Sequence, residues 1–63
     1  MKEVKDLELG MIVKISEIWD GEFGDIDEIL ESGAISPDEE NVISFDVVKN
    51  DGIDSIIEIK DIY

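Results

Sequence analysis

The sequence predicts an α+β domain that is mainly β: a small, curved antiparallel sheet with one short helix at about residues 25–32. A length of 63 residues suits a single domain, residues 1–63. Hydrophobic residues make up 43% of the chain, which is too many for a disordered acidic tail. Apolar residues also recur with period two in three segments, as they do in half-buried strands.

The first strand is expected at about residues 10–18. Apolar residues alternate with others from residue 7 onward, at Leu7, Leu9, Met11, Val13 and Ile15. Gly10 interrupts this alternation and indicates a bend or bulge where the strand begins.

Residues 19–24 are expected to form a loop, because two glycines break the strand pattern. This loop carries Trp19 and Phe23, two of the chain's four aromatic residues. An aromatic ring on a loop either folds back onto the core or faces a partner. We favour the core for Trp19 and weigh the two positions equally for Phe23.

The helix at residues 25–32 has a signal at each end. Asp25 is a suitable N-cap, with Glu28 three residues later, and Gly33 suits a left-handed C-terminal residue. Its apolar residues share one face at helical spacing: Ile26, Ile29 and Leu30. Two turns are too short to be stable alone in water, so this face must pack on the sheet.

A second helix-start signal lies at residues 36–40, where Ser36 precedes Pro37 and Glu39 stands at the third helical position. One helical turn and a polar loop are equal alternatives for this segment.

Residues 42–48 and about 53–60 are expected to pair as an antiparallel hairpin. Asp51-Gly52 stands between these two alternating runs and is a strong turn signal. A two-stranded hairpin is marginally stable, so the first strand must join it. The core is then expected to comprise Leu9, Met11, Val13, Ile15, Ile26, Ile29, Leu30, Ile43, Phe45, Val47, Ile57 and Ile59.

The opening run LELGMIVKI and the closing run IIEIKDI resemble the first and last strands of SH3-like small barrels. The resemblance covers about a third of the chain and implies an SH3-like partial barrel as one form of the sheet. It carries no functional residue.

The chain is expected to be non-enzymatic and to need no cofactor. It contains neither histidine nor cysteine, so it lacks an imidazole base, a thiol nucleophile and thiolate metal ligands. An EF-hand register starting at Asp20 fails, because Asp25 stands where the loop requires glycine. No specific metal site is predicted.

Charge is the strongest clue to a partner. The net charge is −13, so direct binding to nucleic acid or to an anionic membrane is not expected. No basic residue lies between Lys14 and Lys49, whereas 11 acids do. Such segregation favours a basic protein surface as the partner. That the charge serves mainly solubility is an equal alternative.

The favoured function is a block of the basic groove of a nucleic-acid-handling protein, such as a nuclease, by an acidic surface that imitates nucleic acid. In size, charge and lack of catalytic residues the chain is similar to anti-restriction and anti-CRISPR inhibitors of phages and mobile elements. The expected contacts are Glu22, Asp25, Asp27, Glu28 and Glu31, with Trp19 or Phe23 as an apolar anchor. Neutralisation of a basic toxin is electrostatically the same hypothesis.

The alternative is a small β-rich interaction or assembly module whose charge is mainly solvating. Its exposed strand edge, at residues 53–60, would pair with a partner or a second copy, so a homodimer stays open. The N-terminus lacks the apolar run of a signal peptide, and no run approaches the ~20 apolar residues of a membrane span. A cytoplasmic location is therefore expected.

Overall fold

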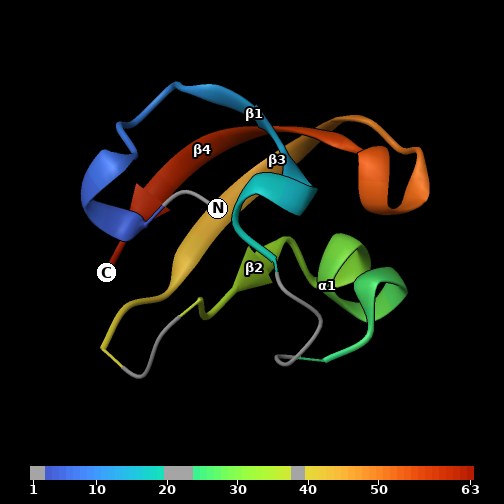
Figure 1. The fold of residues 1–63 in the computed structure, drawn as a ribbon, viewed down its shortest axis with the longest axis horizontal. Coiled ribbons are helices and arrows are strands. Elements are labelled where there is room, and N and C mark those ends of the chain that lie inside the picture. Colours follow the sequence, from blue (N-terminus) through green and yellow to red (C-terminus); the bar gives the residue numbers. More distant parts are fainter. Residues whose placement is uncertain (1–2, 20–23, 38–39) are drawn as a thin grey trace.

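The computed structural model describes residues 3–19, 24–37 and 40–63, which form a four-stranded antiparallel sheet with a helix against one face (Figure 1). The strands are β1 (Ile12–Lys14), β2 (Ala34–Ile35), β3 (Ile43–Lys49) and β4 (Ile56–Ile62), and the α-helix is α1 (Ile26–Ser32). Three short 3-10 turns complete the described elements: η1 (Val4–Asp6), η2 (Ile15–Glu17) and η3 (Gly52–Asp54).

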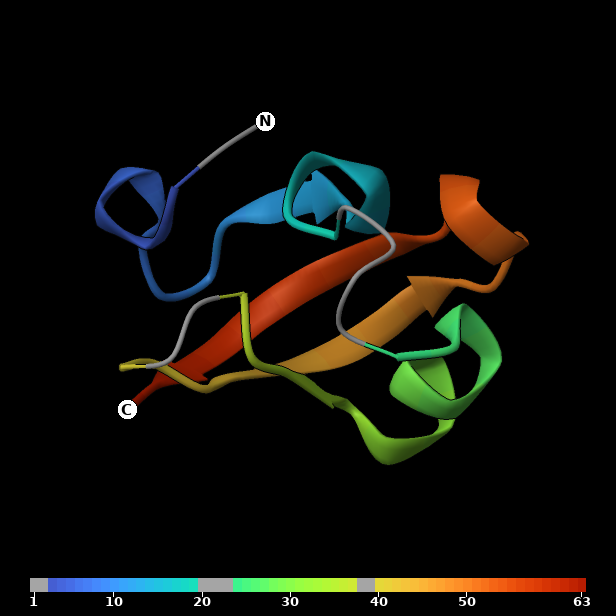
Figure 2. The same ribbon diagram turned by 60° about the horizontal axis from the view of Figure 1, so that its bottom comes forward.

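The strand order is β1-β4-β3-β2, with all neighbours antiparallel (Figure 2). The mainly β α+β class is confirmed, but the sheet is open and does not close as an SH3-like barrel. β4 lies between β1 and β3, so the prediction of a free strand edge at residues 53–60 is wrong. The short strands β1 and β2 form the two edges instead.

The hairpin of β3 and β4 is confirmed, but its turn is longer than Asp51-Gly52 suggests. Residues Gly52–Asp54 form η3, and β4 begins at Ile56 instead of residue 53. The buried Ser55 closes this turn: its Oγ accepts from the Asp51 N–H and donates to the Gly52 carbonyl oxygen, each at 2.7 Å. The Ser55 hydroxyl therefore satisfies the Asp51 N–H and the Gly52 carbonyl oxygen, two backbone groups that have no strand partner in this longer turn.

Two register shifts bend the hairpin, one between Ser44 and Phe45 and one between Val47 and Lys49. Such irregularities bend a strand and increase its twist. Val47 lies at the second shift and is 36% exposed, so its predicted place in the core is wrong.

β1 is shorter than the strand expected at residues 10–18. After Lys14 the chain turns into η2, where the Lys14 N–H donates to a Glu17 carboxylate oxygen at 2.8 Å. Ile15 and Ile18 are three residues apart in this turn and both are buried. The spacing of buried residues therefore changes from two to three within the predicted strand.

The chain also turns before β1, at Gly10. The Gly10 φ is +85°, its N–H donates to the Ile59 carbonyl oxygen at 2.7 Å, and Met11 N–H donates to the Glu8 carbonyl oxygen at 3.1 Å. The predicted bend is confirmed, but it breaks the alternation that placed Leu9 in the core. Leu9 is 65% exposed, whereas Leu7 is buried.

Helix α1 begins and ends as predicted. The Asp25 side chain caps it by accepting from the Asp27 N–H at 3.2 Å. Gly33 ends it with a φ of +73°, in the left-handed conformation that glycine adopts without strain. The Gly33 carbonyl oxygen then accepts from the Phe45 N–H at 2.9 Å, which ties the helix end to β3.

The segment after α1 was predicted least well. Ala34 and Ile35 form β2 against Ser44 and Ile43, an edge strand that the sequence did not indicate. The described part of residues 36–40 has no helical turn, and residues 38–39 lie outside the described part of the chain.

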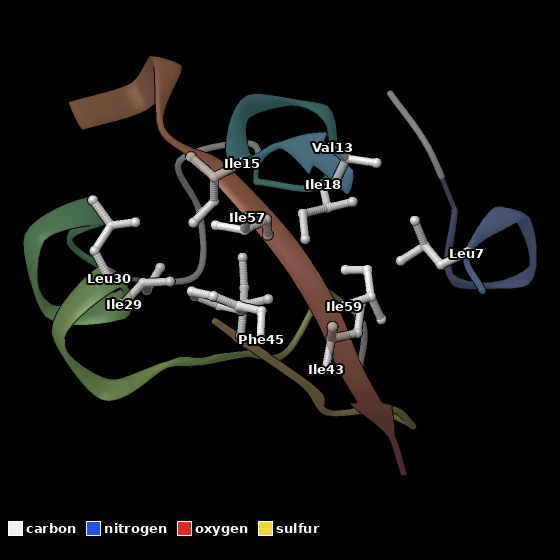
Figure 3. Packing of buried hydrophobic residues seen from close by; sticks show 11 residues of the cluster. Leu7, Val13, Ile15, Ile18, Ile29, Leu30, Ile43, Phe45, Ile57 and Ile59 are labelled. Carbon is white, nitrogen blue, oxygen red and sulfur yellow. The ribbon is translucent and has the colours of Figure 1, made fainter. Parts of the chain in front are cut away.

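The core lies between the sheet, α1 and the two N-terminal 3-10 turns. Figure 3 shows Ile29 and Leu30 of α1 at one end of the cluster, Leu7 at the other, and β4 side chains between them. The buried hydrophobic residues are Leu7, Val13, Ile15, Ile18, Ile29, Leu30, Ile35, Ile43, Phe45, Ile57 and Ile59. Eight of these were predicted; Met11 and Ile26 are only partly buried, and Leu7, Ile18 and Ile35 were missed.

Candidate functional site

Helix α1 presents its acidic residues on the side away from the core. Around a helix of 3.6 residues per turn, Asp27, Glu28 and Glu31 lie within about 100° of one another, opposite the buried Ile29 and Leu30. All three are exposed, as is the N-cap. We call Asp25, Asp27, Glu28 and Glu31 the α1 acidic surface.

Three of these four acids have a local structural role. Asp25 caps the helix, and Asp27 and Glu28 lie in its first turn. Acids at a helix N-terminus interact favourably with the helix dipole and with unpaired N–H groups. Helix formation alone therefore explains these three residues.

Glu31 has no such role. It lies at the C-terminal end of α1, where the helix dipole disfavours negative charge. It also stands four residues after Asp27 and three after Glu28, and each like-charge pair costs about 0.2–0.5 kcal/mol. Among the described residues no lysine pairs with α1, since the ion pairs there involve Lys5 and Lys60. Glu31 is therefore the acid that folding explains least.

Two further acids lie beside the α1 acidic surface. α1 contacts η3, and the exposed Asp54 belongs to η3 while the exposed Asp51 precedes it (Figures 1 and 2). Sequence reasoning missed both, because they come 19 and 22 residues after the end of α1 and follow Lys49. No local signal indicates that the β3–β4 turn folds next to the helix.

The acid-only segment between Lys14 and Lys49 is not one uniform face in the described residues. Asp46 lies on β3 and forms an ion pair with Lys60 at 3.5 Å. Glu17 is partly buried and bonds the Lys14 backbone. The α1 acidic surface with Asp51 and Asp54 is the part of the candidate site that the fold brings together.

The predicted apolar anchors are placed only in part. Trp19 folds back against the core, as favoured from the sequence, and its indole Nε1 donates to the Gly24 carbonyl oxygen at 3.3 Å. Glu22 and Phe23, the other predicted contacts in this loop, lie outside the described residues.

The exposed carboxylates are suited to long-range attraction of cations and basic groups. Within residues 3–19, 24–37 and 40–63, no three acidic side chains are grouped so that they could hold a metal ion. No helix in this part of the chain has the length and apolar character needed to cross a bilayer.

No family model, curated protein or solved structure matches this chain. Its function must therefore be argued from its own charges and surfaces.

Proposed function

We propose that this chain is a non-catalytic binding domain that blocks the basic groove of a nucleic-acid-handling protein. The α1 acidic surface, with Asp51 and Asp54, imitates the phosphates of nucleic acid. The proposal describes an inhibitor of the type that phages and mobile elements make against nucleases. Such a surface binds lysine and arginine side chains in place of a phosphate backbone.

Glu31 is the observation that carries this proposal. The Glu31 carboxylate disfavours the helix, has two acids beside it and has no lysine partner among the described residues, so it lowers the stability of the fold. A surface that served only solubility would gain by mixing lysines with these acids, because mixed charge also keeps a protein soluble.

The fold makes Glu31→Lys a clean test. A lysine at this position would favour the helix dipole and pair with Asp27 four residues earlier, so the variant is expected to fold at least as stably as the parent chain. Asp25 must stay unchanged, because loss of its cap costs about 1 kcal/mol and confuses binding with folding.

Glu8→Lys is the matched control. Glu8 is exposed and lies in the segment after η1, which is across the molecule from α1 (Figure 1). Both substitutions change the net charge by the same amount. A purely nonspecific attraction to basic proteins therefore weakens equally in the two variants.

The assay measures binding to a panel of purified nucleases and other DNA-binding proteins, with the basic protein lysozyme as a non-nucleic-acid control. We expect at least one panel member to bind the parent chain in competition with duplex DNA, with affinity that falls steeply with salt. Glu31→Lys should weaken this binding about tenfold or more, and Glu8→Lys much less. Equal loss in both variants, or equal binding to lysozyme, would refute a dedicated acidic surface.

A further inference from the structure

The sheet has a second face, on the side away from α1 and the core. On β1, on β3 as far as Asp46 and on β4 as far as Lys60, its residues alternate with the buried ones. Lys49 and Asp61 follow the register shifts and are placed by their strand partners Ile56 and Ser44. One row is Ile12–Glu58–Asp46, and the next is Lys14–Ile56–Lys49. We call the following residues the outer face: Ile12, Lys14, Ser44, Asp46, Lys49, Ile56, Glu58, Lys60 and Asp61.

The outer face has no net charge, in contrast to the rest of the chain. It carries three lysines and three acids, whereas the remainder has 15 of the 18 acids and two of the five lysines. Lys60 is paired there with Glu58 at 3.2 Å and with Asp46 at 3.5 Å. Two copies of a chain with a charge of −13 repel each other, and this repulsion is weakest where neutral faces meet.

Apolar side chains lie among these charges. Ile12 is 55% exposed on β1, and Ile56 is partly exposed on the neighbouring strand, one row away. Exposed branched residues flanked by lysines gain free energy when another surface covers them.

The order of the charges makes the face complementary to itself. Consider a two-fold axis in the plane of the interface that runs perpendicular to the strands and passes between the two rows. This axis would place the Lys49 row of one copy over the Asp46 row of the other copy. Lys49 of each copy then lies against Asp46 of the other copy, and Lys14 of each copy lies diagonal to Glu58 of the other copy. We propose that the outer face binds a second copy of this chain and forms a back-to-back two-fold dimer of sheets.

The size of the molecule sets the expected strength. A typical stable interface buries about 800 Å² per partner, which is about a fifth of the 4013 Å² accessible surface of this chain. The widest outline of the molecule is 25 × 24 Å, so one flat face offers a smaller area than a typical stable interface buries. A dimer in the micromolar range or weaker is expected, and its formation does not depend on what the α1 acidic surface binds.

Sedimentation velocity of the parent chain, from micromolar to millimolar concentration, should show a shift from 7.1 kDa to twice that mass. Ile12→Lys should weaken association about tenfold or more, because it removes the apolar contact twice and places a lysine against Lys14 of the other copy. Within one copy the new lysine would lie beside Glu58, which favours folding. Ile53→Lys is the matched control, since Ile53 is 52% exposed on η3 and makes the same charge change.

A charge exchange gives the sharpest result. Lys49→Glu and Asp46→Lys should each be monomeric, whereas an equal mixture of the two should form a mixed dimer, because each variant supplies the charge that the other needs. Circular dichroism of each variant confirms that it is folded before it is mixed.

Restored association in the mixture, together with loss in Ile12→Lys and retention in Ile53→Lys, would establish the interface. A parent chain that stays monomeric at millimolar concentration would overturn the proposal. So would a dimer that survives Ile12→Lys and Lys49→Glu, because another surface would then mediate it. Binding of a different protein to the outer face of a monomeric chain would also overturn it.

Discussion

Two leucines near the N-terminus provide the strongest test of the fold. Leu7 and Leu9 are two residues apart, and simple alternation gives them the same environment. The structure separates them: Leu7 is 6% exposed and belongs to the core, whereas Leu9 is 65% exposed. The turn at Gly10 causes the difference. Replacing each leucine with alanine removes the same atoms, in one case from the core and in the other from the exposed surface.

The expected loss for Leu7→Ala is about 2–3 kcal/mol in the free energy of unfolding. Buried Leu→Ala substitutions cost about 2–5 kcal/mol, and Leu7 lies at the rim of the core, where neighbours can relax into the space (Figure 3). Leu9→Ala should change stability by less than about 0.5 kcal/mol. A chain of 63 residues is stable by about 3–9 kcal/mol in total, so Leu7→Ala should leave it close to its unfolding threshold.

Urea unfolding followed by Trp19 fluorescence and by circular dichroism measures both variants. With an m-value near 1 kcal/mol/M for a domain of this size, Leu7→Ala should lower the urea midpoint by about 2–3 M and leave the slope unchanged. The Leu9→Ala midpoint should stay within about 0.5 M of the parent chain. Equal losses for the two variants, or a larger loss for Leu9→Ala, would refute the turn at Gly10 and the core built on it.

Three further outcomes are expected. Ser55→Ala should cost about 1–3 kcal/mol in urea unfolding, because it removes two hydrogen bonds of 2.7 Å made by a buried side chain; an equal loss for the exposed Ser16→Ala would contradict this role. Gly33→Ala should cost about 2 kcal/mol, because alanine resists a φ of +73° and its Cβ would lie 3.3 Å from a carbonyl oxygen of β3; a neutral effect on the thermal midpoint would show that α1 ends differently. The pKa of Lys60 is raised above 10.5, chiefly by its hydrogen bond to Glu58, so the stabilisation it contributes is present below pH about 10.5 and is lost as the pH rises through the folded pKa. An NMR titration should show this pKa falling toward 10.5 in Glu58→Gln, and no change would contradict the pairing.

Sequence reasoning succeeded where a structural signal was local. The cap at Asp25 and the left-handed Gly33 are set by residues within one turn of each helix end, and both were predicted. The pairing of β3 with β4 follows from a turn between two alternating runs. Prediction failed for Leu9, because the turn at Gly10, whose N–H donates to the carbonyl oxygen of the distant Ile59, ends the alternation that placed Leu9 in the core. The failure to predict β2 has a similar cause: this strand is too short to show an alternating pattern, and it forms because it pairs with β3.

The candidate site shows the same division. The acids of α1 were predicted as a group, because they lie together on the predicted helix within the acid-only segment. Helical spacing then places Asp27, Glu28 and Glu31 on one side. Their neighbours Asp51 and Asp54 were missed, because the contact between α1 and η3 joins segments that are distant in sequence. Asp46 was assigned to the acid-only segment, but strand pairing moves it to the outer face beside Lys60.

Composition and local pattern determined that this chain folds as a small, mainly β domain with one capped helix and a large excess of negative charge. These properties depend on residue types and on spacings of two to four residues, which a linear sequence shows directly. Only the tertiary structure decided that β4 is an interior strand, that Leu7 replaces Leu9 in the core, and that the neutral outer face lies opposite the acidic helix. Each of these depends on strand order and register, which are set by contacts between segments far apart in the chain.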